Sequence, residues 1–149
     1  MEWQRGNPEV ARQDQIVLDS SVIVKWFTQE EGSDRAVELM ESFVRGSLAI
    51  LASSLSLYEV ANALRYKSDF KAEDVRNSLA QLMSLRLEVK ALTPRLVGEA
   101  ARIAFEGNVT FYDALPVALA QLEKTSCITA DRSTQFARLS PRGYPIRLL

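Results

Sequence analysis

Five short apolar segments alternate with longer segments of helical periodicity, and this alternation constrains the fold more than any other feature of the sequence. The short segments lack the apolar–polar alternation of half-exposed strands, which is typical of parallel strands buried on both faces. They span residues 15–18, 48–51, 88–92, 127–129 and 146–148. Strands that alternate with helices predict an α/β fold, in which helices flank a single parallel sheet of about five strands.

The segments between the predicted strands have the spacing of helices. Amphipathic helices are predicted at residues 34–44, 72–85 and 94–105, the last with Thr93 as its N-cap and Pro94 at its first position. Two further segments, residues 56–66 and 112–123, are apolar nearly all round, so we expect both helices to be largely buried. Residues 1–14 show no periodicity and are predicted to form an irregular leader. Residues 15–149 are then expected to form one domain.

Composition excludes several classes of protein. A chain of 149 residues that is 47% hydrophobic and 25% charged can bury a sizeable core and is not typical of disorder. A lone cysteine, Cys127, rules out a disulfide within the chain and is typical of a reducing compartment. No apolar stretch approaches the ~18 residues that a membrane span needs. We therefore expect a cytoplasmic protein with no membrane partner.

Four acidic residues stand at informative places in these apolar segments. Asp19 follows the first predicted strand, and Asp131 lies two residues after the fourth. Ligands of open α/β sheets bind beyond the carboxyl ends of the strands, where both residues are expected. Glu59 interrupts one of the two buried helices, and Asp113 begins the other. Carboxylates beside a dry core lose hydration and repel one another, which a divalent cation would offset. We therefore predict a Mg²⁺ or Mn²⁺ site.

Each acid also has an ordinary structural interpretation. Asp19 and Asp131 could cap the segments that follow them, and Glu59 could point into solvent. Asp113 has the spacing of a capping box with Thr110. The metal hypothesis therefore depends on all four acids converging in the fold.

Four short motifs surround these acids. They are Leu18-Asp19-Ser20-Ser21, Tyr58-Glu59-Val60-Ala61-Asn62, Phe111-Tyr112-Asp113-Ala114-Leu115-Pro116 and Ile128-Thr129-Ala130-Asp131. In this order and spacing they resemble the PIN domain (PilT N-terminal domain), most closely the VapC-type toxins of bacterial and archaeal toxin–antitoxin pairs. The resemblance covers the chain from about residue 15 to its end.

This resemblance implies a PIN-like fold, a parallel and mostly five-stranded sheet between helices, and the activity of a metal-dependent endoribonuclease. It also implies two protein partners, a cognate antitoxin and a second copy of the chain in a homodimer. The sequence departs from the family in its 14-residue leader and at Pro116, where an ordinary helix former is expected. If Asp113 lies near the N-cap, Pro116 falls in the first turn, where a helix tolerates proline.

The resemblance and the chemistry together assign roles to the motif residues. All four acids are predicted to be catalytic, with Asp19, Glu59 and Asp113 as the principal metal ligands and Asp131 as a direct or water-mediated ligand. Ser21, Thr129 and Asn62 are the predicted supporting residues. Ser21 and Thr129 could orient carboxylates, although ordinary strand-end capping explains them equally well, and Asn62 could hold Glu59 in place.

The predicted contacts with RNA are basic and aromatic. Arg65, Lys67 and Arg132 could bind RNA phosphates, with surface charge of no specific function as the alternative. Trp26 and Phe27 could stack on a base, with core or dimer packing as the alternative. The net charge is −1, and if four acids share one pocket, the rest of the surface is net positive. That balance is compatible with a nucleic-acid substrate.

The leading hypothesis is therefore a Mg²⁺- or Mn²⁺-dependent endoribonuclease toxin that cleaves RNA. The alternative is a non-catalytic PIN-like module that binds RNA or protein. A phosphoacceptor domain fits poorly, because serines follow Asp19 and no suitable lysine follows the strand at Cys127. A dehydrogenase also fits poorly, because no glycine-rich turn follows the first strand.

Overall fold

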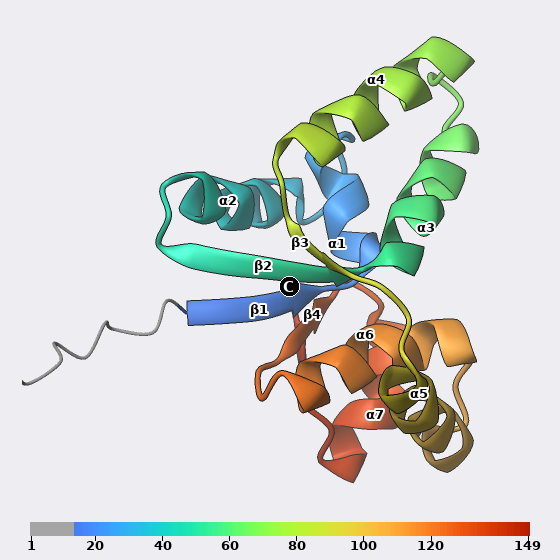
Figure 1. Ribbon diagram of the computed structural model, residues 1–149. Helices are drawn as coiled ribbons and strands as arrows, with labels where there is room; N and C mark the ends of the chain where they lie inside the picture. The colour runs from blue at the N-terminus through green and yellow to red at the C-terminus, as the bar shows by residue number, and fades with distance from the viewer. Residues whose placement is uncertain (1–13) are drawn as a thin grey trace, which may run out of the picture.

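A computed structural model describes residues 14–149 and contains one sheet of five parallel strands (Figure 1). The strands are β1 (Asp14–Leu18), β2 (Leu48–Ser53), β3 (Glu88–Lys90), β4 (Cys127–Thr129) and β5 (Ile146–Leu148). The predicted α/β fold and its five-stranded parallel sheet are confirmed. β4 and β5 have the predicted bounds, and β1 begins one residue earlier than predicted. The rest of the expected leader, residues 1–13, lies outside the described residues.

Helices cover both faces of the sheet (Figure 1). On one face lie α1 (Ser20–Ile23), α2 (Ser33–Val44), α3 (Ser54–Arg65) and α4 (Ala72–Ser84). On the other lie α5 (Pro94–Gly107), α6 (Phe111–Leu122) and α7 (Ala137–Leu139). Short irregular helices are η1 (Val24–Trp26), η2 (Arg132–Phe136) and η3 (Ser140–Arg142), of which η2 is a π-helix. None of the helices in the described range is long and apolar enough to span a membrane.

The two-sided cover explains the unbroken apolar segments of the sequence. Ile16 and Leu18 of β1 pack into the core under α1 to α4, whereas Val17 between them packs into the core under α5 and α6. Both faces of the central strand are therefore dry, and a polar residue on either face would be buried. The edge strand β3 differs, because Val89 is 41% exposed.

The two helices that were predicted to be largely buried have different environments. In α6, every residue from Ala114 to Ala120 is buried, as predicted. For α3 the prediction is wrong: Val60 and Leu64 face the core, but Tyr58 is 74% exposed. α3 packs through one face only. The tyrosines that made its sequence look apolar all round carry a polar hydroxyl and tolerate solvent.

The strand order reverses at the central strand, β1. The order is β3-β2-β1-β4-β5, so the chain adds strands on one side of β1 and later returns to its other side. β1 and β4 are therefore neighbours, with Leu18 paired to Ile128. The reversal of strand order between them is a topological switch point, where open α/β sheets bind ligands.

Candidate functional site

Asp19 lies at this switch point, directly after β1, and is buried. It caps α1, and its Oδ2 accepts hydrogen bonds from the Ser21 backbone N–H, at 3.2 Å, and from the Ser21 hydroxyl. The Thr129 hydroxyl oxygen lies 3.3 Å from the same Oδ2. The capping interpretation of Asp19 is therefore correct, and it uses one oxygen only. Every buried side-chain oxygen in residues 14–149 has a hydrogen-bond partner. The Oδ1 atom of Asp19 accepts no hydrogen bond within these residues, so it is open to solvent.

Glu59 approaches this carboxylate from α3. Burial raises the pKa of Glu59 from 4.5 to about 7, and the negative charges of Asp19 and Asp113 contribute to the rise. A hydrogen bond with Ser20 opposes it. The half-buried Glu59 side chain therefore faces other carboxylates, and the solvent-facing interpretation does not describe it.

Asp113 occupies the first turn of α6. Thr110 is the N-cap and accepts a hydrogen bond from the Asp113 N–H at 3.0 Å, as the capping-box spacing predicted. Pro116 therefore lies inside the helix, beyond the first turn, and the helix nevertheless continues to its end. Burial raises the pKa of Asp113, and the charges of Asp19 and Asp131 add to this rise. Thr110 and the Arg138 guanidinium oppose it.

Asp131 is the N-cap of the π-helix η2. Its Oδ1 accepts a hydrogen bond from the Thr134 N–H and its Oδ2 one from the Gln135 N–H, both at 3.1 Å. Both carboxylate oxygens are thus used in capping. The charge of Asp131 still acts on Asp113, which places it at the rim of the same cluster.

The four acids thus share one electrostatic environment, which we call the acid cluster. Its members are Asp19, Glu59, Asp113 and Asp131. Within the described residues, no three potential ligands are close enough to form a complete metal-binding group. The acid cluster is therefore an open arrangement of carboxylates and not a closed cage. Its donors are all carboxylate oxygens, without imidazole or thiolate, which fits the preference of Mg²⁺ and Mn²⁺.

The three predicted supporting residues differ in their contacts. Ser21 and Thr129 both reach Asp19, and the Ser21 hydroxyl oxygen also accepts a hydrogen bond from the Ala130 N–H at 2.9 Å. Asn62 is exposed and makes no hydrogen bond to Glu59 in the part of the chain that the structure describes. Asn62 and Glu59 are three residues apart on one helix, which places them on the same side of the helix but not in contact.

A residue that the sequence analysis did not identify completes the support of the acid cluster. Gln135 is 1% exposed and lies in η2. Its Nε2 donates to the Asp113 carbonyl oxygen at 2.8 Å, and its Oε1 accepts from the Thr129 hydroxyl at 2.5 Å. Neither helical nor strand periodicity marks a residue of a π-helix, so the sequence offered no signal for it.

The predicted RNA-binding residues are only partly available. Arg65 lies 5.4 Å from the ring centre of Tyr66, and Lys67 forms an ion pair with Glu30 at 3.1 Å. Arg132 is exposed and has no ion pair or hydrogen bond through its side chain within residues 14–149. Arg132 therefore has the freest charge of the three.

Trp26 and Phe27 are partly buried against the core. Both pack against the buried cluster under α1 to α4, and the Trp26 indole N–H donates to the Ala36 carbonyl oxygen at 2.7 Å. The packing interpretation therefore describes these two residues better than base stacking does.

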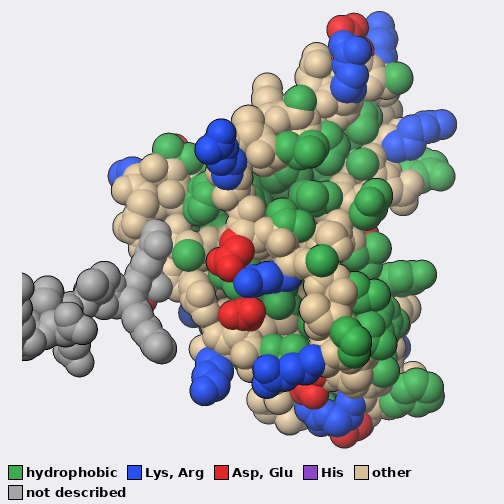
Figure 2. Space-filling view, in the orientation of Figure 1, with side chains coloured by type: hydrophobic (Ala, Val, Ile, Leu, Met, Phe, Trp, Pro, Cys, Tyr) green, Lys and Arg blue, Asp and Glu red, His purple; other side chains and the backbone are tan. Residues whose placement is uncertain are grey.

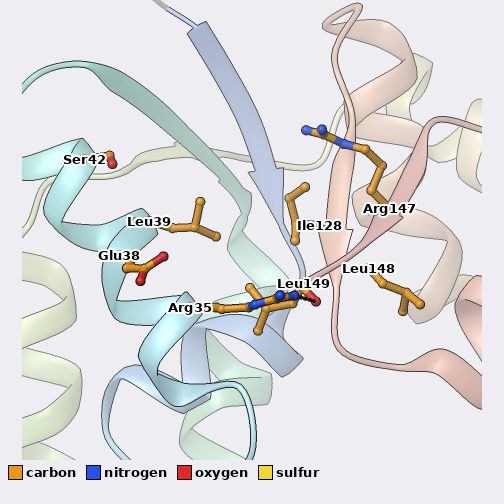
Figure 3. A pocket seen from close by; sticks show the side chains of 8 residues that line it. All are labelled: Arg35, Glu38, Leu39, Ser42, Ile128, Arg147, Leu148 and Leu149. Carbon is orange, nitrogen blue, oxygen red and sulfur yellow. Dashed lines mark hydrogen bonds between the residues drawn. The ribbon is translucent and has the colours of Figure 1, made fainter.

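Two pockets near the sheet lie outside the acid cluster. A pocket of about 380 Å³ between α2 and the strands β4 and β5 is lined by Arg35, Glu38 and Arg147 around an apolar floor (Figure 3). It contains none of the four acids. A second pocket, of about 300 Å³, is lined by Thr129, Arg132 and others, and it also contains none of the four acids.

Comparisons with known proteins agree with this fold. The family model described as PIN domain matches residues 16–140. PAE2754 from Pyrobaculum aerophilum has 24% identity and a TM-score of 0.62, with 89% of this chain and 90% of that chain covered. VapC20 from Mycobacterium tuberculosis, described as a sarcin-ricin loop cleaving toxin, has 17% identity and a TM-score of 0.67, with 87% and 95% covered.

A third similar structure contains a complex. VapBC2 from Rickettsia felis, bound to a DNA fragment from its promoter, has 17% identity and a TM-score of 0.67, with 91% of this chain and 98% of that chain covered. Identities this low describe the fold and not the substrate. A search of curated proteins gave no match.

Proposed function

Because this chain belongs to the PIN domain family, we propose that it is a nuclease that depends on Mg²⁺ or Mn²⁺. The observation that carries the proposal is the position of Asp19, Glu59 and Asp113 at the switch point, where burial and the charge of Asp19 raise the pKa of both Glu59 and Asp113. Such an arrangement costs stability unless a cation shares the site.

We propose a different role in cation binding for each of the four acids. Asp19 offers its open Oδ1, while its Oδ2 is fixed by Ser21. Glu59 and Asp113 are the other direct ligands of the proposal, and they would have to move closer to Asp19 to share one ion with it. Asp131, whose oxygens already cap η2, would act through water. Few direct carboxylates and several waters are the usual environment of Mg²⁺ in proteins.

A bound divalent cation supplies neutralisation of charge and a water of lowered pKa. The side chains of the protein position the substrate. Arg132 is exposed beside the acid cluster, and we propose that it binds a phosphate of the substrate and brings the neighbouring phosphodiester to the acids.

We further propose that the substrate is RNA and that the protein is a toxin of the VapC type. The support is the similarity in fold to toxins such as VapC20, together with the four motifs in their family order. An RNA substrate also accords with a cytoplasmic location.

The test is cleavage of total RNA by the purified protein in the presence of Mn²⁺. Wild-type protein should cut RNA, EDTA should stop it, and Asp19→Asn should lower the rate by at least ~100-fold, because an asparagine removes one anionic ligand. Asp69→Asn is the matched control, since Asp69 is exposed between α3 and α4. Full cleavage by Asp19→Asn, or cleavage in excess EDTA, would refute the proposal. RNA binding without turnover by the wild-type protein would favour the non-catalytic module.

The proposed protein partners are an antitoxin and a second copy of the chain. Similar folds occur in toxin–antitoxin complexes, including FitAB bound to a DNA fragment. On this chain, Tyr58 and Tyr112 are more than half exposed and line an apolar pocket of about 260 Å³ with Leu92. Hydrophobic side chains extend over this side of the molecule (Figure 2). Light scattering should give the mass of a dimer, and Tyr58→Glu should shift it to that of a monomer.

A further inference from the structure

We propose that Gln135 is a positioning residue that fixes the acid-bearing segments relative to one another. It is buried, and it contacts the segments of Asp113 and Asp131 directly and that of Asp19 through Thr129. Its backbone N–H binds Asp131, its side-chain nitrogen binds the Asp113 carbonyl, and its side-chain oxygen binds Thr129, which contacts Asp19. The inference rests on the proposed function only where it concerns metal binding.

The orientation of the Gln135 amide follows from the chemistry of its neighbours. A backbone carbonyl only accepts hydrogen bonds, so the amide nitrogen must face the Asp113 carbonyl oxygen. The amide oxygen then faces Thr129, and an amide oxygen only accepts. The Thr129 hydroxyl must therefore be the donor in that pair.

This assignment decides which hydroxyl group donates a hydrogen bond to Asp19. Thr129 has one hydroxyl proton, and Gln135 receives it, while the Thr129 oxygen accepts from the Asp131 N–H at 3.0 Å. The hydroxyl proton that reaches Asp19 Oδ2 therefore comes from Ser21. Gln135 thus takes the hydroxyl proton of Thr129, so that Asp19 Oδ2 is held by the hydroxyl and backbone N–H of Ser21.

The same amide contacts the turn of α6 that precedes Pro116. Pro116 has no N–H, so the carbonyl of Tyr112, four residues earlier, loses its helical donor, and the proline ring crowds that turn. Asp113 is in this turn, and Gln135 donates to its carbonyl from outside the helix. One side chain therefore ties the end of β4 to the turn that carries Asp113.

The first experiment measures binding of Mn²⁺ to the purified full chain by calorimetry. Gln135→Met keeps the length of the side chain and removes both hydrogen bonds of the amide. We expect it to bind Mn²⁺ about 10- to 100-fold more weakly than wild type, the range for residues that orient metal ligands. Gln121→Met, exposed on α6, is the control and should bind as wild type does. Urea unfolding of each variant establishes that the titrated protein is folded. Wild-type affinity in folded Gln135→Met would overturn the proposal.

A second measurement separates this proposal from the nuclease proposal. If the wild-type protein binds no Mn²⁺, the nuclease proposal fails. The positioning role of Gln135 is then tested without metal. Gln135→Met, Thr129→Val and the double variant are then compared by urea unfolding. A shared hydrogen-bond network predicts that the double variant loses clearly less stability than the two single losses combined. Strictly additive losses would refute the network.

Discussion

Replacing Glu59 by glutamine should stabilise the metal-free protein at pH 8, although glutamate and glutamine have nearly the same shape. In the wild-type protein, burial and the charges of Asp19 and Asp113 make the ionised Glu59 costly, whereas the Ser20 hydrogen bond opposes this cost. A glutamine carbonyl can still accept from Ser20, and it carries no charge for Asp19 and Asp113 to repel.

The magnitude follows from the shift in pKa. Folding raises the pKa of Glu59 from 4.5 to about 7. At about 1.4 kcal/mol for each unit, ionisation would cost roughly 3 kcal/mol. Because Glu59 is only half buried, water screens part of this, and we expect Glu59→Gln to gain about 1–2 kcal/mol at pH 8.

The sign of the pH dependence is specific. Between pH 4.5 and 7 the folded protein keeps a proton on Glu59 that the unfolded chain releases, so wild-type stability falls as pH rises through this window. Above pH 7 the loss is complete. The advantage of Glu59→Gln should therefore be largest at pH 8 and nearly absent at pH 4.5.

The assay is urea unfolding in EDTA at both pH values, with Glu41→Gln as control, because Glu41 is an exposed residue of α2. Added Mn²⁺ should then stabilise wild type more than Glu59→Gln, since a ligand of the native state raises its stability. If Glu59→Gln is less stable than wild type at pH 8, or gains equally at both pH values, the electrostatic argument is wrong.

Three further predictions concern the scaffold, each checked on the purified protein. Gly107→Ala should cost about 1–3 kcal/mol in urea unfolding, because its Cβ would lie 2.3 Å from the buried Leu139 side chain, whereas Gly98→Ala, with open space around it, should gain about 0.5–1 kcal/mol. Thr93→Ala removes the oxygen that accepts from the first turn of α5 and should cost about 1 kcal/mol in the same assay. Cys127 is fully buried, which raises the pKa of its thiol, so it should react with a thiol reagent only after unfolding, and rapid labelling of native protein would contradict this.

The arrangement of the sheet was predictable because its sequence signal is local. Apolar runs such as the one around Val17 reflect burial on both faces, and the position of Asp19 follows from the rule that α/β sites lie at carboxyl ends of strands. The sequence also indicated that Glu59 has a special environment, because a carboxylate in an apolar helix is rarely buried without a partner.

The contacts that depend on distant parts of the chain were not predictable. Lys67 is engaged by Glu30, which is 37 residues away, and no local pattern reveals such a pair. Gln135 lies in a π-helix, whose period matches neither of the two periodicities that a sequence displays. Asn62 was predicted to hold Glu59 in place, but it makes no hydrogen bond to it in the described residues. The spacing on a helix predicts that two residues share a side of the helix, but it does not predict the distance between their side chains.

The central position of β1 also has a consequence for biosynthesis. Of the five strands in this sheet, β1 leaves the ribosome first, yet one of its two neighbours, β4, is made more than a hundred residues later, as the 110-residue separation of Asp19 and Thr129 shows. A partly synthesised chain that ends before β4 has an open side on its central strand, and it lacks both Thr129 and Asp131. The chain must therefore be synthesised beyond Asp131 before the catalytic machinery proposed for this protein can exist.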